Sequence, residues 1–264
     1  MRFAEFDKYF SVMKIELIDF FQSKWDVIFG FLFLGVIIFV YSQLWGLGFA
    51  QKSIQGYDLG KIVFYVAVAE SVWISTRRVY KTIDKDIKQG FIANYLSKPV
   101  DYVLFRLSNS LGKSIITFLI NLALCLILLF ALFGSLPIGL GALLATVIVS
   151  FIAIILLLSV SIAFGLLGFW TEDAEAFQFL YSKAVFIFGG LVFPIDLYPA
   201  WLKAVADFLP FKWGVFASGK IAVSFNIQFF LEVVSMQAFW IVLSLAACFL
   251  LFSRIRKSIF VNGG

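Results

Sequence analysis

The segment RRVYKTIDKDIKQGFIANYLSKPVDYVLFR, from Arg77 to Arg106, decides how this chain is organised. It separates two strongly apolar regions and carries seven of the chain's 21 basic residues. These are Arg77, Arg78, Lys81, Lys85, Lys88, Lys98 and Arg106. A basic segment between apolar runs is typical of a loop that sets the orientation of a protein in a membrane.

The composition around this segment is that of a membrane protein. The 264 residues are 62% hydrophobic and only 14% charged, with a mean hydropathy of +1.00, whereas a soluble domain carries about 25% charged residues. Several apolar runs approach the ~20 residues that cross a bilayer. Because these runs are continuous, they exclude a barrel of alternating strands. We therefore predict an all-α integral membrane protein that forms one transmembrane domain over residues 1–264.

Six apolar runs predict six transmembrane helices. Their expected bounds are 27–49, 61–76, 114–133, 141–170, 176–193 and 229–252. Residues 1–26 repeat apolar side chains at three- and four-residue steps, as in Phe3, Phe6 and Phe10, which predicts an amphipathic helix. Such a helix suits the membrane interface, although packing on the protein's own core is the alternative.

The distribution of basic residues predicts the orientation. With six spans, the N-terminal segment, the basic loop, the acidic turn after Trp170 and the C-terminal tail share one side of the membrane. That side holds 16 of the 21 basic residues, and an excess of Lys and Arg marks the cytosolic side. We expect a multi-pass protein of the plasma (inner) membrane with both termini in the cytosol.

A proline-rich segment, FPIDLYPAWL, follows the fifth run on the opposite side. Pro194 and Pro199 cannot continue a regular helix. The next residues, AWLKAVADFLPF, place Trp201 on an apolar helical face that Pro210 closes. We predict short re-entrant or amphipathic helices between spans five and six.

Several kinds of chemistry are excluded. The chain has no His, and Cys125 and Cys248 lie in apolar runs, where we expect buried thiols and no metal site. The phosphate loop G-x-x-x-x-G-K-[ST] is not met, because Leu107 stands where the first glycine before Gly112 is required. The basic residues cluster between apolar runs, so we expect no nucleic-acid partner. The chain itself is predicted not to be an enzyme.

Two acidic features remain. Glu70 lies inside the predicted second span, where an acid usually faces a partner or a water-filled path, and Trp73 lies one turn further on the same face. These residues belong either to a translocation path or to a structural link between spans. Glu172, Asp173 and Glu175 form an acidic turn, and we expect Thr171 to cap a helix whose first turn holds them.

Two patches resemble one family. IKQGFIANYLSKPV is similar to the I-x-x-G-x-I-x-x-x-L-x-x-P-V stretch of type-2 ABC transporter permeases, in the six-span branch that works beside a separate ATPase subunit. The matching residues are Ile87, Gly90, Ile92, Leu96, Pro99 and Val100. On the opposite side, FPIDLYPAWL…LPF resembles that branch's F-P…P-x-W-L…L-P-F. The matching residues there are Phe193, Pro194, Pro199, Trp201, Leu202, Leu209, Pro210 and Phe211.

The resemblance implies the membrane subunit of an ATP-driven exporter. Two permeases, identical or paralogous, would enclose a path through the membrane lipid, and two ATP-binding subunits would dock below them. ATP and Mg²⁺ would be bound by those subunits, with no cofactor in this chain. A coupling helix is expected within Ile83–Leu96, and Glu172, Asp173 and Glu175 are a possible second contact. The expected coupling residues are Ile83, Ile87, Gly90, Phe91, Ile92 and Leu96, and the expected outer gate residues are Phe193, Pro194, Pro199, Trp201 and Pro210.

The residues of the coupling segment agree with that role. Ile83, Ile87 and Phe91 recur every four residues and offer an apolar face to a partner's groove. Asp84 and Asp86, with the neighbouring lysines, are expected to keep the segment in water. The alternative is a loop whose lysines only set the orientation.

Other functions stay open at this point. An ATP-independent secondary transporter or channel could use Glu70 as a proton or ion site. A membrane-embedded enzyme acting on lipids is disfavoured, because the chain has no His and no paired acids inside its spans. The substrate is not indicated by any of these features.

Overall fold

The computed structural model describes residues 2–22, 24–51, 56–76, 79–96, 100–136 and 138–262. In this part of the chain every regular element is helical and no strand occurs, so the all-α prediction is confirmed. The helices are α1 (Arg2–Gln22), α2 (Lys24–Gln51), α3 (Leu59–Thr76), α4 (Val79–Lys88), α5 (Phe91–Leu96), α6 (Tyr102–Phe133), α7 (Leu140–Leu167), α8 (Glu175–Phe188), α9 (Ala200–Asp207), α10 (Ala217–Val223) and α11 (Ile227–Asn262). Short turns η1 (Gly168–Trp170), η2 (Ile195–Leu197) and η3 (Lys212–Phe216) complete the fold. Of the residues singled out above, Arg77, Arg78, Lys98 and Pro99 lie outside the described part.

Among the described residues, five helical segments are long and apolar enough to cross a membrane. They lie in α2, α3 to α4, α6, α7 to η1, and α11. The predicted span 176–193 is instead α8, whose 14 residues extend about 21 Å, against ~30 Å of bilayer hydrocarbon. Six full-length spans are therefore not confirmed. The helix stops before Pro194 because Gly189 and Gly190 follow it, and Gly190 takes the left-handed φ of 67°.

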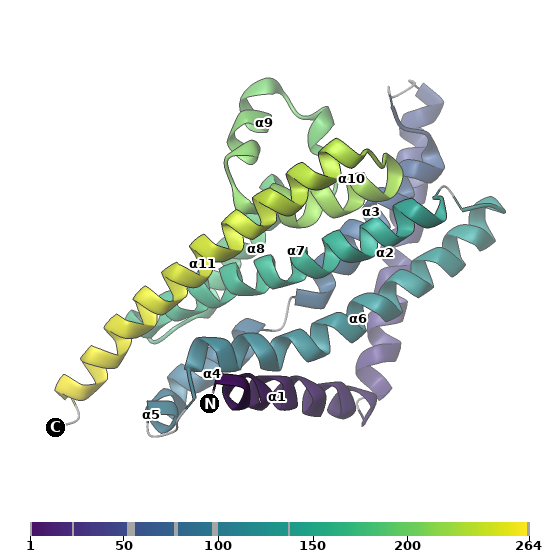
Figure 1. Cartoon of the computed structure of the whole chain (residues 1–264). Helices are drawn as coiled ribbons and strands as arrows, with labels where there is room; N and C mark the ends of the chain where they lie inside the picture. The colour runs from purple at the N-terminus through teal and green to yellow at the C-terminus, as the bar shows by residue number, and fades with distance from the viewer. Residues whose placement is uncertain are drawn as a thin grey trace.

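The long helices run back and forth between two ends of the molecule (Figure 1). The start of α1, the elements α4 and α5, and the end of α11 lie at one end, and α9 lies at the other. This is the arrangement that two termini on one side of a membrane require.

The centre of the fold is formed by α3 and α7. Residues 62–69 of α3 are all buried, and α10 and α11 pack on α7 while α2 and α6 flank α3. The outer helices keep exposed apolar side chains, such as Leu47 on α2, Ile127 on α6 and Val242 on α11. Exposed apolar surface on long helices is what a lipid environment would cover.

Helix α1 packs along the first half of α6, as the core-packing alternative proposed (Figure 1). Gly112 has no side chain that would collide with the backbone of Met13. The Tyr9 hydroxyl accepts a hydrogen bond of 3.0 Å from the Asp101 amide. Phe10, Ile15 and Ile18 remain exposed on another face of α1, which is free to enter a membrane interface.

Helix α6 begins twelve residues before the predicted span. Asp101 caps it by accepting a hydrogen bond of 2.9 Å from the Leu104 amide. Its 32 residues extend about 48 Å, more than the ~30 Å of hydrocarbon. The first turns of α6 therefore project beyond the apolar layer, and their polar residues are helical rather than part of a loop.

Close packing of α10 on α3 generates a stability prediction. A Cβ at Gly219 would lie 2.6 Å from a ring carbon of Tyr65 and 2.9 Å from its carbonyl oxygen. We expect Gly219→Ala to destabilise the protein by about 1–3 kcal/mol, because the backbone must move apart. Thermal unfolding of the purified protein in detergent measures this.

The matched control is Gly35→Ala in α2, where nothing lies within 4 Å of the new Cβ. Alanine is the better helix former, so this change should leave the midpoint unchanged or raise it, by up to about 1 kcal/mol. Equal midpoints for both variants would show that α10 and α3 are not in close contact.

Candidate functional site

The predicted coupling segment forms two helices joined at an angle, which we call the elbow: α4, Gln89, Gly90 and α5. Gly90 has φ 66°, a left-handed conformation that glycine adopts without strain. Its amide donates to the Ile87 carbonyl at 3.1 Å and closes the end of α4. Gly90 therefore divides the predicted single helix in two.

The apolar stripe of the elbow does not face one way. Ile83 and Ile92 are buried, and Ile83 fills the notch left by Gly165 of α7, where an added Cβ would come within 2.9 Å of it. Ile87 is partly buried, while Phe91 is 42% exposed. The side chain of Leu96 lies outside the described structure. Within this chain, Ile83 and Ile92 therefore hold the elbow to the core, and Phe91 is the apolar side chain left for a partner.

The two acids of α4 are not in water, so that expectation was wrong. Asp86 is 3% exposed, forms an ion pair with Arg106 of α6 and accepts a hydrogen bond of 2.7 Å from the Tyr102 hydroxyl. Arg106 also donates to the Tyr95 hydroxyl at 3.0 Å. We call Asp86, Tyr95, Tyr102 and Arg106 the Arg106 cluster. It joins α4, α5 and α6 through buried, charge-assisted hydrogen bonds.

Asp84 joins α4 to the acidic turn. Its carboxylate accepts a hydrogen bond of 3.1 Å from the Ala174 amide and pairs with Lys88 at 2.9 Å. Lys88 also lies 3.9 Å from Asp173. The elbow and the turn, which the sequence proposed as two separate contacts, therefore form one surface. Its exposed residues are Lys85, Lys88, Gly90, Phe91, Glu172 and Glu175, and we call them the elbow surface.

The capping role predicted for Thr171 was wrong. The Thr171 hydroxyl donates to the carbonyls of Gly168 and Asp173. Asp173 instead accepts from the Glu175 amide at 2.9 Å, and α8 begins at Glu175. Gly168 keeps the turn tight, because a Cβ there would collide with Ala174.

Glu70 and Trp73 lie in the interior, on α3. Glu70 is 6% exposed and interacts electrostatically with Tyr41 of α2. The Trp73 ring packs at 5.7 Å on Tyr181 of α8. Arg77, two turns after Glu70, lies outside the described residues. These two side chains thus sit where α2, α3 and α8 approach one another.

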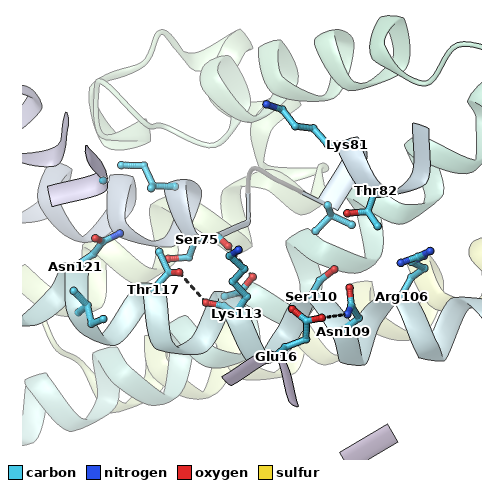
Figure 2. Close-up of a pocket in the computed structure, with 15 residues that line it drawn as sticks. Glu16, Ser75, Lys81, Thr82, Arg106, Asn109, Ser110, Lys113, Thr117 and Asn121 are labelled. Atoms are coloured by element: carbon cyan, nitrogen blue, oxygen red, sulfur yellow. Dashed lines mark hydrogen bonds between the residues drawn. The ribbon is translucent and has the colours of Figure 1, made fainter. Parts of the chain in front are cut away.

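The structure also contains a polar cavity that the sequence did not predict. It has a volume of about 550 Å³ and lies among α1, α2, α3, α4 and α6 (Figure 2). Helix α6 lines it with one face, made of Arg106, Asn109, Ser110, Lys113, Ser114, Thr117, Ile120 and Asn121. The three- and four-residue spacing of these residues was the available signal. It was missed because the first half of this face was assigned to a loop.

The outer segment is held onto α3 and α10. Asp196 accepts hydrogen bonds from Lys220 at 2.6 Å and from the Tyr57 hydroxyl at 3.1 Å. Burial, and then the charge of Asp196, raise the pKa of Tyr57, so its hydroxyl stays protonated. The Tyr65 hydroxyl donates to the Gly190 carbonyl at 2.5 Å. These contacts position the stretch from Gly190 to Asp196.

The predicted gate residues lie around this anchor. Pro194 and Pro210 are buried, and Pro199 precedes α9. Phe193 is 52% exposed and Trp201 is 69% exposed. The predicted amphipathic outer helix is present as α9.

Metal chemistry has no candidate here. Among the described residues, no group of three or more potential ligands comes together. Cys125 and Cys248 are free, buried thiols, as predicted.

Comparison with known families gives one match. The family model described as "ABC-2 family transporter protein" matches residues 28–263. No curated protein matches the sequence.

The Arg106 cluster generates a stability prediction. Asp86→Asn removes the charge that faces the buried guanidinium of Arg106, and breaking a buried pair costs about 3–5 kcal/mol. We expect a large fall in the thermal midpoint of the purified protein.

The matched control is Asp58→Asn. Asp58 pairs with Lys61 at 3.5 Å across exposed side chains, and such pairs contribute about 0–1 kcal/mol. The new Asn can still cap α3 through the Lys61 amide. Similar midpoints for the two variants would contradict a structural role for the cluster.

Proposed function

Because the chain belongs to the ABC-2 transporter family, we propose that it is the permease of an exporter driven by ATP hydrolysis in separate subunits. Family membership makes it a multi-pass membrane component of an ABC transporter, whose expected partner is an ATP-binding subunit. The observation that carries the finer proposal is the connected elbow surface. Elbow and acidic turn are joined by Asp84 and Lys88, so one partner can push on both.

The proposed mechanism follows the contacts of the elbow. Movement of α4 reaches α6 through Asp86 and Arg106, α7 through Ile83 in the Gly165 notch, and the start of α8 through Asp84 and Ala174. These contacts are buried, and buried polar networks hold their geometry more rigidly than exposed ones. Closure of an ATP-binding dimer would then displace three helices together.

The proposed assembly has two ATP-binding subunits and a second permease, either another copy or a paralogue. ATP and Mg²⁺ are held by the ATP-binding subunits, because this sequence has no phosphate loop. We place the complex in the plasma (inner) membrane with both termini and the elbow in the cytosol. The outer gate is then the segment with Phe193, Pro194, Pro199, Trp201 and Pro210.

A direct prediction concerns Phe91. We expect Phe91→Ala to reduce co-purification of the ATP-binding subunit roughly tenfold, because truncating an exposed aromatic anchor at an interface costs about 1–2 kcal/mol or more. The chain should still fold, since Phe91 supports no buried contact that we identify. The ratio of the two subunits after affinity purification, quantified by mass spectrometry, gives the result.

The control is Phe208→Ala, the same change at an 81% exposed phenylalanine just after α9. It should leave the subunit ratio unchanged. Full recovery of the ATP-binding subunit with Phe91→Ala, or an equal loss with Phe208→Ala, would remove the elbow surface from the interface.

Glu70 and Trp73 are proposed for the translocation path. We expect Glu70→Gln to lower the ATPase activity of the purified complex several-fold while the thermal midpoint changes little, since the neutral amide has the same shape and can keep a hydrogen bond. Wild-type ATPase activity in this variant would assign Glu70 a structural role.

The rival function, an ATP-independent carrier, makes the opposite prediction. Liposomes that hold the chain alone should not dissipate a proton gradient if the permease needs its ATP-binding partner. A gradient that collapses with the wild-type chain, and persists with Glu70→Gln, would favour the carrier.

A further inference from the structure

We propose that the cavity beside α6 binds an anionic phosphate group, that of an acidic phospholipid. The site lies on α6 and α1, away from the elbow surface, and does not depend on the proposed coupling. Its lining contains Glu16 of α1, Lys81 and Thr82 of α4, Ser75 of α3 and the polar face of α6. Figure 2 shows Arg106, Asn109, Lys113 and Thr117 following one another along that helix.

The first observation is that buried donors lining the cavity have no acceptor. Arg106 is 6% exposed and Asn121 is 3% exposed. Among the described residues, Arg106 Nε and Asn121 Nδ2 have no hydrogen-bond partner. A buried donor without a partner costs about 1–3 kcal/mol, so a bound acceptor would recover free energy at both places.

The second observation is the charge of the lining. Lys81, Arg106 and Lys113 contribute three positive charges. Asp86, which pairs with Arg106, and Glu16 contribute two negative charges, so the described side chains leave a net +1. Water can satisfy hydroxyl and amide groups in a polar cavity, but it does not supply a compensating negative charge. An anion does both.

The third observation is the depth of the site. The first turns of α6 project beyond the hydrocarbon, so Arg106 and Lys113 lie near the level of the lipid headgroups. Asn121 is eight residues after Lys113, about 12 Å further along the helix. An acidic phospholipid has phosphate oxygens at the first level and ester carbonyls deeper, whereas free phosphate reaches only the first. The orphaned amide of Asn121 therefore favours the lipid.

The amphipathic helix α1 covers the site from one side. Glu16 bonds to Asn109 across the contact between α1 and α6, and Gly112 lets the two helices approach closely. The exposed apolar residues Phe10, Ile15 and Ile18 would place α1 at the membrane interface. A lipid bound here would contact both α1 and α6.

The test uses native mass spectrometry of the full-length chain, purified in detergent and mixed with equal amounts of phosphatidylglycerol and phosphatidylcholine. The wild type should retain phosphatidylglycerol preferentially. Lys113→Gln should weaken its retention roughly tenfold, because a charge-assisted hydrogen bond is lost. Lys113→Arg should restore it. Lys183→Gln, at an exposed lysine of α8, should behave as wild type.

Two further arms identify the source of the phosphate. Asn121→Leu should weaken phosphatidylglycerol retention if the deeper amide contacts the lipid ester. Inorganic phosphate at millimolar concentration should then compete poorly. Strong competition by inorganic phosphate with no effect of Asn121→Leu would assign the site to free phosphate and overturn the lipid assignment.

The whole proposal is overturned if the wild type retains both lipids equally, or if Lys81→Gln and Lys113→Gln both leave the preference intact. Lys81 is exposed, so its variant gives an answer even where Lys113→Gln fails to fold. The measurement contains no ATP-binding subunit. A failure here is therefore distinct from a failure of the proposed coupling.

Discussion

The buried ion pair between Asp86 and Arg106 is the contact on which the arrangement of the elbow depends. Two charges taken out of water are costly, and the pair is stable only when other hydrogen bonds satisfy both groups. Tyr102 and Tyr95 supply those bonds. Because Asp86 lies in the middle of α4, its position also determines where the rest of that helix points. Ile83 then meets Gly165, and Asp84 meets the Ala174 amide.

This constraint divides the elbow by function. Its buried residues connect it to α6, α7 and the start of α8, and its exposed residues form a continuous surface with the acidic turn. An apolar stripe that faced wholly outward would bind a partner but would transmit little force to the spans. The division observed here combines an exposed contact with rigid attachment. It also explains why one short segment can carry both charged and apolar residues without being a loop in water.

The sequence was sufficient for the helical class, the membrane location and the family, because these depend on long apolar runs and on motifs local in the chain. It was insufficient for contacts between distant residues. Asp86 looked solvated because Arg106, twenty residues later, could not be recognised as its partner. The polar face of α6 was missed because its first turns precede the apolar run. The predicted fifth span failed to reach full length because two glycines end the helix before the proline that seemed decisive.

Helix α3 links the elbow end of the molecule to the outer segment. Near one end, the Ser75 carbonyl accepts a hydrogen bond of 2.7 Å from Ser114 of α6. Near the other, Tyr65 holds the Gly190 carbonyl and packs against Gly219 of α10. A helix with buried contacts along its length moves as a unit. Displacement of α6 by the elbow would therefore shift α3, and with it the turn at Gly190 that positions the outer segment. In this fold a push at the elbow need not travel through the bilayer as a deformation, because one central helix has both ends attached to the parts that must move together.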